Sequence, residues 1–405
     1  MTSQRAPESP PDASREEDAG KPLRGLTVLD LSRVLTGPYA AMLLGDLGAR
    51  VIKVERPGLG DETRGWGPPF VGTGEGRTST YFLSVNRNKE SIGLDLRDPD
   101  DREVLLGLTR KADILVENFR PGVLERLGLG HDVFRETNPR LIVVSISGFG
   151  HDGPSAQRAG YDQIIQGEAG VMSMTGPDAG QPTKVGLPIA DLSAGMFGVI
   201  GALAAVEERH RTGRGRVVHT SLLSSLVGMH TFQGTRWLLG KELPEASGNN
   251  HPTVSPYGAY RCSDGELVQI AVGNQSLWNR FAPAVGIDAD DPRFATNEAR
   301  RKHEEELDLL IGGAFGTRSA REWTDELELA GVPTGVIRTL EDVYADPQVI
   351  SQGLVADVDD PRLGPLKVPG NPIRWDDDAP AQRHRPAPLL DEHGEQLRRW
   401  AAHDQ

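Results

Sequence analysis

The N-terminal half of the chain alternates short runs of β-favouring residues with longer helical stretches. The runs LTVLDLS (residues 26–32) and ARVIKVE (49–55) enclose the helical stretch GPYAAMLLGDLG, and two further runs follow at 113–118 and 141–147. Apolar runs of about four to eight residues, separated by helices of about ten or more, are typical of parallel βαβ units. We therefore expect an α/β fold whose large domain is doubly wound and Rossmann-like.

The pattern changes near residue 226. The stretch YGAYRCSDGELVQIAV (257–272) is typical of a β-hairpin turning at Ser263, Asp264 and Gly265, because Asp-Gly suits the positive φ of tight turns. An amphipathic helix (275–286) follows, and a Pro- and Gly-rich segment then returns to the first domain. We predict a disordered tail (1–23), a large α/β domain (24–225), a small α+β domain (226–335) and a return segment completing the large domain (336–405).

Composition excludes several classes of function. The net charge of −14 and the pI near 5.2 argue against a nucleic-acid binder, because phosphate contacts need a basic face. The single cysteine, Cys262, cannot form an internal disulfide, and no Cys/His cluster has zinc-ligand spacing. The longest apolar run (194–206) is shorter than the roughly 20 residues of a membrane span, and residues 1–23 lack the features of an export or transit peptide. We expect a cytoplasmic protein with no metal, membrane or nucleic-acid partner.

The motifs of common α/β enzymes are absent. The first strand-to-helix turn reads LDLSRVLTGPYA and lacks the G-x-G-x-x-G fingerprint of dinucleotide enzymes. The stretch GTGEGR (72–77) lacks the Gly-Lys-Ser/Thr ending of a phosphate loop, and no G-x-S-x-G elbow marks a hydrolase serine. An acidic α/β dehydrogenase is therefore disfavoured.

One carboxylate, Asp191, stands at the start of a long small-residue helix within KVGLPIADLSAGMFGVIGALAAVEERHRTGRG (184–215). Asp is a strong N-cap residue, so a purely structural role is open. A catalytic role is also open, because a carboxylate at a helix N-terminus is held beside backbone amides that can stabilise an oxyanion.

Several long motifs occur in one order along the chain: LDLSRVLTGPYAAMLLGDLGARVIKVERPG, NRNKESIGLDL, DILVENFRPGVLERLGLG, AGYDQIIQGEAGVMSMTG, GLPIADLSAG and RTGRGRVV. From Leu23 to about Leu397 the chain resembles the class III CoA-transferases, the CaiB/BaiF family. The resemblance implies an intertwined homodimer, coenzyme A as a substrate rather than a permanently bound cofactor, and Asp191 as the nucleophile.

CoA is a polyanion, so in an acidic chain its phosphates need specific arginines. The resemblance places the CoA-contacting positions in the large domain, at Arg56, Leu94, Arg97, Asn118, Phe119, Arg126 and Tyr161.

Within the family, GDETRGWGPPFVGTGEGRTSTYFLSVNRNKESIGLDL and HPTVSPYGAY resemble the branch that moves CoA between dicarboxylates, such as succinyl-CoA:glutarate CoA-transferase. The glutamine and the tetraglycine loop of formyl-CoA transferases are replaced by Leu35 and AVGNQSLW. Arg64 is the candidate partner of the substrate's distal carboxylate.

The alternative is an α-methylacyl-CoA racemase, which has a histidine where this chain has Tyr161. A phenol, which loses its proton near pH 10, is a poor general base at neutral pH.

Overall fold

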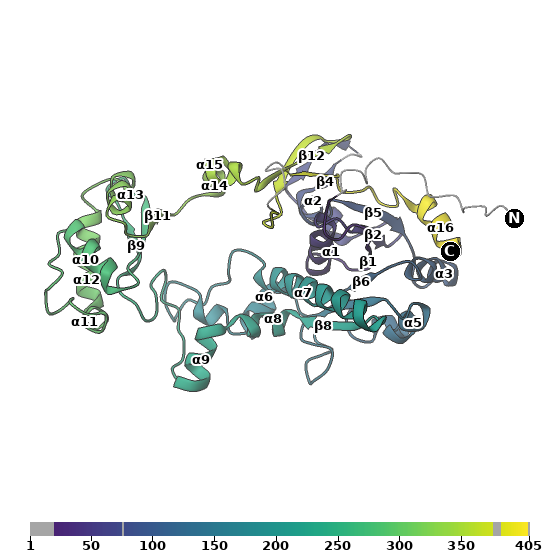
Figure 1. Cartoon of the computed structure of the whole chain (residues 1–405), viewed down its shortest axis with the longest axis horizontal. Helices are drawn as coiled ribbons and strands as arrows, with labels where there is room; N and C mark the ends of the chain where they lie inside the picture. Colours follow the sequence, from purple (N-terminus) through teal and green to yellow (C-terminus); the bar gives the residue numbers. More distant parts are fainter. Residues whose placement is uncertain (1–19, 75–76, 376–381, 404–405) are drawn as a thin grey trace. The chain divides into compact units, whose positions relative to one another are not determined.

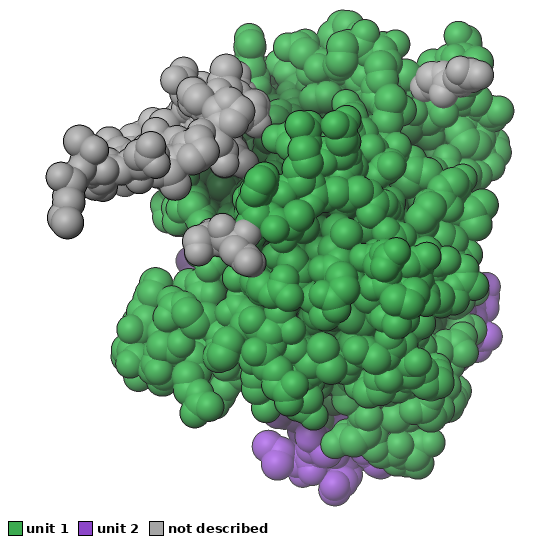
Figure 2. All heavy atoms as spheres, turned by 90° about the vertical axis from the view of Figure 1, so that its right-hand side faces the viewer, with its two compact units in different colours: residues 1–169, 186–234, 348–405 green, residues 170–185, 235–347 purple. Residues whose placement is uncertain are grey.

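The computed structural model describes residues 20–74, 77–375 and 382–403. The chain divides into two compact units, which Figure 2 colours separately. The first contains the described residues of 1–169, 186–234 and 348–405, and the second contains 170–185 and 235–347. Residues 1–19 of the predicted tail lie outside the described residues.

The residue boundaries of the second unit differ from those of the small domain predicted at 226–335. Helix α8 (Leu222–Met229) follows strand β8 (Val217–Ser221) directly and begins with a capping box on Ser221. Because α8 packs against α6 and α7, the chain remains in the first unit until residue 234. The second unit gains residues 170–185 and extends to Pro347, beyond helix α14 (Leu340–Ala345).

A parallel sheet forms the centre of the first unit. Its strand order is β5-β2-β1-β6-β7-β8, and every neighbouring pair is parallel. The four strands predicted from sequence are present, as β1 (Thr27–Asp30), β2 (Arg50–Glu55), β6 (Ile114–Glu117) and β7 (Ile142–Ser147). The expected doubly wound α/β arrangement is confirmed.

Strands β5 (Lys89–Gly93) and β8 are additional to the predicted ones. The sequence of β5, KESIG, is polar, yet all of its residues are buried. The Lys89 ammonium donates to the Asp30 carboxylate at 2.8 Å, Arg50 donates to Glu90 at 2.8 Å, and Ser91 donates to Glu55 at 2.7 Å. Buried polar groups that are paired in this way can occupy a central layer, which hydrophobic patterning does not reveal.

Helices cover both faces of the sheet (Figure 1). On one face α3 (Pro99–Thr109), α5 (His131–Thr137) and α16 (Gly394–Ala402) share a hydrophobic core with the strands. On the other face α1 (Thr36–Asp46) packs against α7 (Ile189–Thr212), and α7 crosses β7 and β8. Alternate residues of β7 supply the two faces, because side chains in a strand point to opposite sides.

Helix α16 brings the C-terminal segment back to the first unit. In Figure 1 it lies, in yellow, beside α3. Its approach is fixed by the Asp391 carboxylate, which accepts from the Gly93 amide at 2.8 Å, and by Arg398, which donates to the Gly93 carbonyl at 2.7 Å.

The remaining elements of the first unit are η2 (Glu62–Gly65), β3 (Phe70–Val71), β4 (Thr78–Ser79), α2 (Thr80–Val85), α4 (Val123–Arg126), α6 (Asp162–Glu168), β12 (Val355–Asp360), β13 (Gly364–Pro369) and β14 (Arg383–His384). Two further helices, α9 (Thr231–Gly240) and α15 (Pro347–Ser351), run across the boundaries between the units.

The second unit contains the predicted hairpin. Strands β9 (Tyr257–Arg261) and β10 (Leu267–Ala271) are antiparallel, and Gly265 has the positive φ of +87° that the turn requires. The other elements are η4 (Met172–Met174), α10 (Gln275–Ala284), α11 (Asn297–Lys302), α12 (Glu304–Phe315), α13 (Ala320–Leu329), β11 (Thr334–Val336) and α14.

Helix α7 is long and apolar enough to cross a membrane, with a mean hydropathy of 1.8 over its most apolar window. Half of that window is buried inside the protein. The apolar composition reflects packing on the sheet, where Gly201 lies so close to Val218 that a Cβ atom would approach it to 2.5 Å.

Candidate active site

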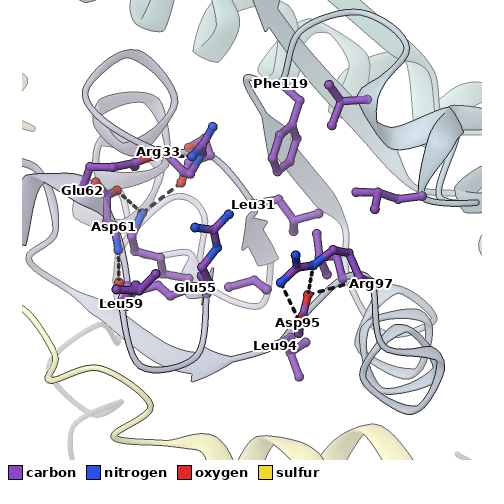
Figure 3. Close-up of a pocket in the computed structure, with 18 of the residues that line it drawn as sticks. Leu31, Arg33, Glu55, Leu59, Asp61, Glu62, Leu94, Asp95, Arg97 and Phe119 are labelled. Atoms are coloured by element: carbon purple, nitrogen blue, oxygen red, sulfur yellow. Dashed lines mark hydrogen bonds and ion pairs between the residues drawn. The ribbon is translucent and has the colours of Figure 1, made fainter.

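A large cavity lies at the carboxyl ends of the central strands. The strand order places β1 and β6 at the centre, where the chain switches from one side of the sheet to the other, and doubly wound folds bind ligands at this point. The cavity has a volume of about 750 Å³. Figure 3 shows its lining, which includes Leu31 and Arg33 after β1, Leu94 and Arg97 after β5, and Phe119 after β6.

A second cavity, of about 180 Å³, contains Asp191. It shares Arg33, Phe119 and Arg120 with the first cavity, so the two are neighbours. Both are lined entirely by residues of the first unit.

Most of the predicted site residues line one or both of these cavities. The first is lined by Arg56, Leu94, Arg97, Phe119 and Arg126, and the second by Asn118, Phe119, Tyr161 and Asp191. Phe119 and Arg120 line both cavities, whereas Asn118 lines only the second. Arg64 lines neither.

Arg64 is held elsewhere by a buried carboxylate. Its guanidinium donates to both oxygens of Glu55, at 2.8 and 2.6 Å, and to the Pro388 carbonyl at 3.2 Å. It also lies 3.8 Å from the centre of the Phe82 ring. Although burial raises it, the hydrogen bonds and charge of Arg64 hold the pKa of Glu55 below its ordinary value. The guanidinium is therefore committed to a structural pair and is not free for a substrate carboxylate.

Asp191 is not the N-cap residue of its helix. Helix α7 begins at Ile189 after Pro188, so Asp191 is its third residue. The capping role belongs to Asp162 on α6, whose carboxylate accepts from the backbone amides of Ala190 at 2.8 Å and Asp191 at 3.3 Å. The structural reading of Asp191 is thereby corrected, because another residue satisfies the first-turn donors and leaves the Asp191 side chain free for chemistry.

The carboxylate of Asp191 is partly buried and accepts a hydrogen bond at Oδ1 from the Thr36 hydroxyl. Burial raises its pKa to about 6, the Thr36 hydrogen bond opposes the rise, and the charge of Asp162 adds to it. At pH 7 the group is still mainly ionised, yet it is a stronger base than an ordinary aspartate. A carboxylate that is both anionic and poorly solvated is suited to nucleophilic attack.

Sequence reasoning missed Thr36, Asp162 and Tyr81 as parts of the site. Burial and the charges of Asp191 and Asp162 raise the pKa of Tyr81, on α2, to about 12. Thr36 and Asp191 are 155 positions apart, so only the folded chain brings them together.

The arginines of the larger cavity differ in their pairing. In the described parts of the chain, neither Arg56 nor Arg126 forms an ion pair within 4.0 Å with a carboxylate. Arg97 instead pairs with Asp95 through two hydrogen bonds of 3.0 Å (Figure 3). Two guanidinium groups are thus available to an anion, and a third must first leave its partner. Among the described residues, no group of three or more His, Cys, Asp and Glu side chains is placed to hold a metal ion.

Comparison with known proteins identifies the family. The profile of CoA-transferase family III matches residues 23–394. The chain belongs to CoA-transferase family III. It is thus an enzyme that transfers CoA, which confirms the activity class predicted from the sequence motifs.

The family includes close relatives of known name. The chain is 40% identical over 378 residues to a mouse protein named succinyl-CoA:glutarate CoA-transferase, covering 93% of this chain and 85% of that one. It is 40% identical over 382 residues to the succinate–glutarate CoA-transferase of Agrobacterium fabrum, covering 93% and 94%. The crystal structure of a CaiB/BaiF family protein from Brucella suis superimposes with a TM-score of 0.84 at 39% identity, covering 94% of this chain and 99% of that chain.

Proposed function

We propose that this CoA-transferase moves CoA from succinyl-CoA to a small dicarboxylate, with Asp191 as the covalent nucleophile. The observation that carries the proposal is the Asp191 carboxylate, which is partly buried, has a raised pKa and lies in the cavity next to the larger one. The names of the mouse and Agrobacterium relatives support the choice of donor and acceptor.

In this proposal the larger cavity holds the nucleotide end of CoA. Arg56 and Arg126 bind its phosphates, and Arg97 joins them after exchanging its bond to Asp95. The pantetheine arm passes Phe119, which lines both cavities, and Asn118, which lines the second, and carries the thioester to Asp191.

The first half of the reaction transfers CoA to the enzyme. Oδ2 of Asp191 attacks the succinyl carbonyl carbon, the carbon–sulfur bond breaks, and a mixed anhydride and the CoA thiolate result. The thiolate then attacks the Asp191 side-chain carbonyl carbon. The bond between that carbon and Oδ2 breaks, so succinate leaves with the oxygen and an aspartyl-CoA thioester remains.

The second half reverses these steps with the acceptor. A carboxylate oxygen of the acceptor attacks the aspartyl thioester carbon and expels the CoA thiolate, which gives a second anhydride. The thiolate attacks the acceptor's carbonyl carbon in this anhydride, releasing the new acyl-CoA and regenerating the Asp191 carboxylate. Every step exchanges one nucleophile for one leaving group, so no net proton or electron is transferred.

Arg158 is the cation that we assign to the distal carboxylate of the substrates. It lines the Asp191 cavity but not the larger one, as expected of a contact at the acyl end. Its guanidinium pairs with Glu168, and both side chains are nearly half exposed. An exposed pair of this kind contributes little to stability, so a substrate carboxylate can replace Glu168 at low cost.

A homodimer is part of the proposal. Helices α6, α7 and α8 pack together and expose large apolar side chains, including Ile164 (50% exposed), Ile200 (60%) and Val227 (51%). Large exposed apolar side chains on packed helices are typical of a protein interface, and a second copy of the chain is the partner that the family resemblance implies. We expect sedimentation of a dimer at micromolar concentration, and a stable active monomer would contradict it. A cytoplasmic location stays a prediction.

The decisive experiment mixes the protein with succinyl-CoA and a panel of unlabelled mono- and dicarboxylic acids, and identifies new acyl-CoA species by mass spectrometry. We expect glutarate or another dicarboxylate of four to six carbons to give the main product. Pentanoate, which matches the length of glutarate without its second carboxylate, is the control. Equal use of pentanoate and glutarate would refute the dicarboxylate assignment and leave CoA transfer intact.

A further inference from the structure

The Thr36 hydroxyl has a position that the sequence motifs do not assign to any role. Thr36 is the first residue of α1 and is only 4% exposed. Its Oγ1 donates to Oδ1 of Asp191, across a contact between α1 and α7. It lines the Asp191 cavity and is absent from the lining of the larger cavity.

The approach of the two helices depends on Gly195, one helical turn after Asp191. A Cβ atom at Gly195 would lie 2.9 Å from the Thr36 carbonyl oxygen and 3.0 Å from the Tyr39 ring. Any larger residue would therefore force α1 away from α7 and lengthen the Thr36–Asp191 hydrogen bond.

The turn before Thr36 is held in an unusual conformation. Val34 has a φ of +70°, which is costly for a β-branched residue. Its amide donates to the Asp61 carboxylate at 3.3 Å, and Asp61 is itself fixed by the fully buried Lys53 at 2.9 Å. Two buried charges thus maintain the turn that presents the Thr36 hydroxyl to Asp191.

We propose that Thr36 is the oxyanion donor for reactions at the Asp191 side-chain carbonyl carbon, an inference that rests on the proposed covalent mechanism. With Oδ1 bound to Thr36, Oδ2 is the oxygen left to attack the substrate. In the anhydride and in the aspartyl thioester, Oδ1 becomes the carbonyl oxygen, and the donor already faces it.

The chemistry at that atom requires no proton transfer. When the CoA thiolate attacks the anhydride carbon, a carbon–sulfur bond forms and the π electrons move to Oδ1. The Thr36 O–H stabilises this negative charge, the carbonyl re-forms, and the pair of electrons of the bond to Oδ2 leaves with the carboxylate. The same donor serves when the acceptor carboxylate attacks the thioester. A preorganised donor of this type contributes about 10²- to 10³-fold to kcat.

The test compares Thr36→Val, which has the same shape without a donor, with Thr36→Ser, which keeps the hydroxyl. We expect Thr36→Val to reduce kcat for succinyl-CoA:dicarboxylate exchange by about 10²- to 10³-fold, with little change in KM for succinyl-CoA. Thr36→Ser should keep kcat within about tenfold. Thr137→Val, which removes a hydroxyl that donates to the Val133 carbonyl, is the matched control for loss of a hydroxyl in a helix.

A second measurement reports on the hydrogen bond without requiring transfer. Thermal stability is followed across pH, and the part that depends on Asp191 is identified by its loss in Asp191→Asn. Other charged or titratable groups near the carboxylate are Asp162 on α6, Tyr81 on α2, and Arg33, Arg120, Arg158 and Tyr161 around the cavity. These groups are unchanged in all variants. The pH midpoint of the Asp191-dependent change in thermal stability should move to higher pH in Thr36→Val, because the hydrogen bond that lowers the Asp191 pKa is lost. In Thr36→Ser this midpoint should not change.

The outcomes separate the two hypotheses. If wild-type protein transfers CoA and Thr36→Val retains full kcat, the oxyanion assignment is overturned while the proposed function stands. If the wild type transfers no CoA, the proposed function fails. In that case the oxyanion assignment, which rests on it, fails as well, and the pH midpoint in Thr36→Val reports only whether the Thr36 hydrogen bond lowers the Asp191 pKa.

Discussion

The carboxylate of Asp162 accepts a hydrogen bond of 2.8 Å from the backbone amide of Ala190, the residue directly before Asp191. A cap supplied by a neighbouring helix holds the first turn of α7 and places a second negative charge near Asp191. Stability and reactivity at this helix end are therefore coupled through one side chain.

Replacing Asp162 by Ala should affect both properties. Loss of the cap should lower the free energy of unfolding by about 0.5–2 kcal/mol. Loss of the charge should lower the pKa of Asp191, because Asp162 contributes to its rise, so the acidic limb of the pH–rate profile should move to lower pH. Asp98→Ala removes a cap of the same kind from α3 and should reduce stability without moving the limb. Equal pH profiles in all three proteins would contradict the coupling.

Asp191→Asn should abolish transfer and stabilise the fold at neutral pH. The pKa of Asp191 is about 6 in the folded protein and near 3.8 when unfolded, so ionisation opposes folding as pH rises between these values. The variant should therefore gain up to about 3 kcal/mol over the wild type above pH 6, and nothing below about pH 4. Thermal unfolding across pH checks the gain, and mass spectrometry of the product checks transfer. Substantial transfer by the folded Asn variant would remove Asp191 from the role of nucleophile.

The sequence predicts the strands β1, β2, β6 and β7, because each of these buried strands contains a run of apolar residues. It does not predict β5, because Lys89, Glu90 and Ser91 are buried by pairing with side chains of other elements. Hydrophobic periodicity carries no information about such pairs.

The candidate site, too, could be predicted from the sequence only in part. Long family motifs locate the residues that line the two cavities, since those residues follow the central strands. The motifs do not show which side chains are already occupied. Arg64 stands nine residues from Glu55 in the chain, and only the fold shows that the two form a buried pair. Likewise, the sequence suggests that Asp191 caps its own helix, whereas in the structure Asp162 accepts the hydrogen bond from the first turn of α7.

Arg64→Met should destabilise the protein rather than change its substrate preference. The change leaves the Glu55 carboxylate, 1% exposed, without its guanidinium partner, and breaking a buried pair costs about 3–5 kcal/mol. Because the pKa of Glu55 is lowered, its contribution to stability is present at neutral pH and lost in acid, so the penalty should shrink below about pH 4.

Arg158→Met is the matched variant for substrate preference. Its surface pair with Glu168 contributes little to folding, so the free energy of unfolding should change little. The ratio of kcat/KM for glutarate to that for pentanoate should fall by about 10- to 100-fold, since the charge-assisted hydrogen bond to the distal carboxylate is lost. Should Arg64→Met alter this ratio and Arg158→Met leave it unchanged, the roles of the two arginines are reversed.

Arg56→Gln and Arg126→Gln should each raise KM for succinyl-CoA by about 10- to 100-fold and leave kcat nearly unchanged, because phosphate binding is uniform along the reaction. Arg97→Gln should have a smaller effect, since Arg97 must first give up its two hydrogen bonds to Asp95. Arg135→Gln, an exposed residue of α5, is the control. The differences in KM for succinyl-CoA between these variants and the wild type should become smaller at high ionic strength, because salt screens the attraction between arginine and phosphate. A kcat loss without a KM change would place these arginines elsewhere in the mechanism.

The last prediction separates CoA transfer from racemisation at the carbon beside the thioester. Tyr161 lines the Asp191 cavity and is 64% exposed, in the position where racemases have histidine. A phenol is a poor base at neutral pH, so a 2-methylacyl-CoA incubated with the protein in heavy water should gain no deuterium at carbon 2. Tyr161→His supplies a base of suitable pKa and should introduce slow exchange if geometry alone is sufficient. Rapid exchange by the wild type, lost in Asp191→Asn, would assign the protein to racemase chemistry.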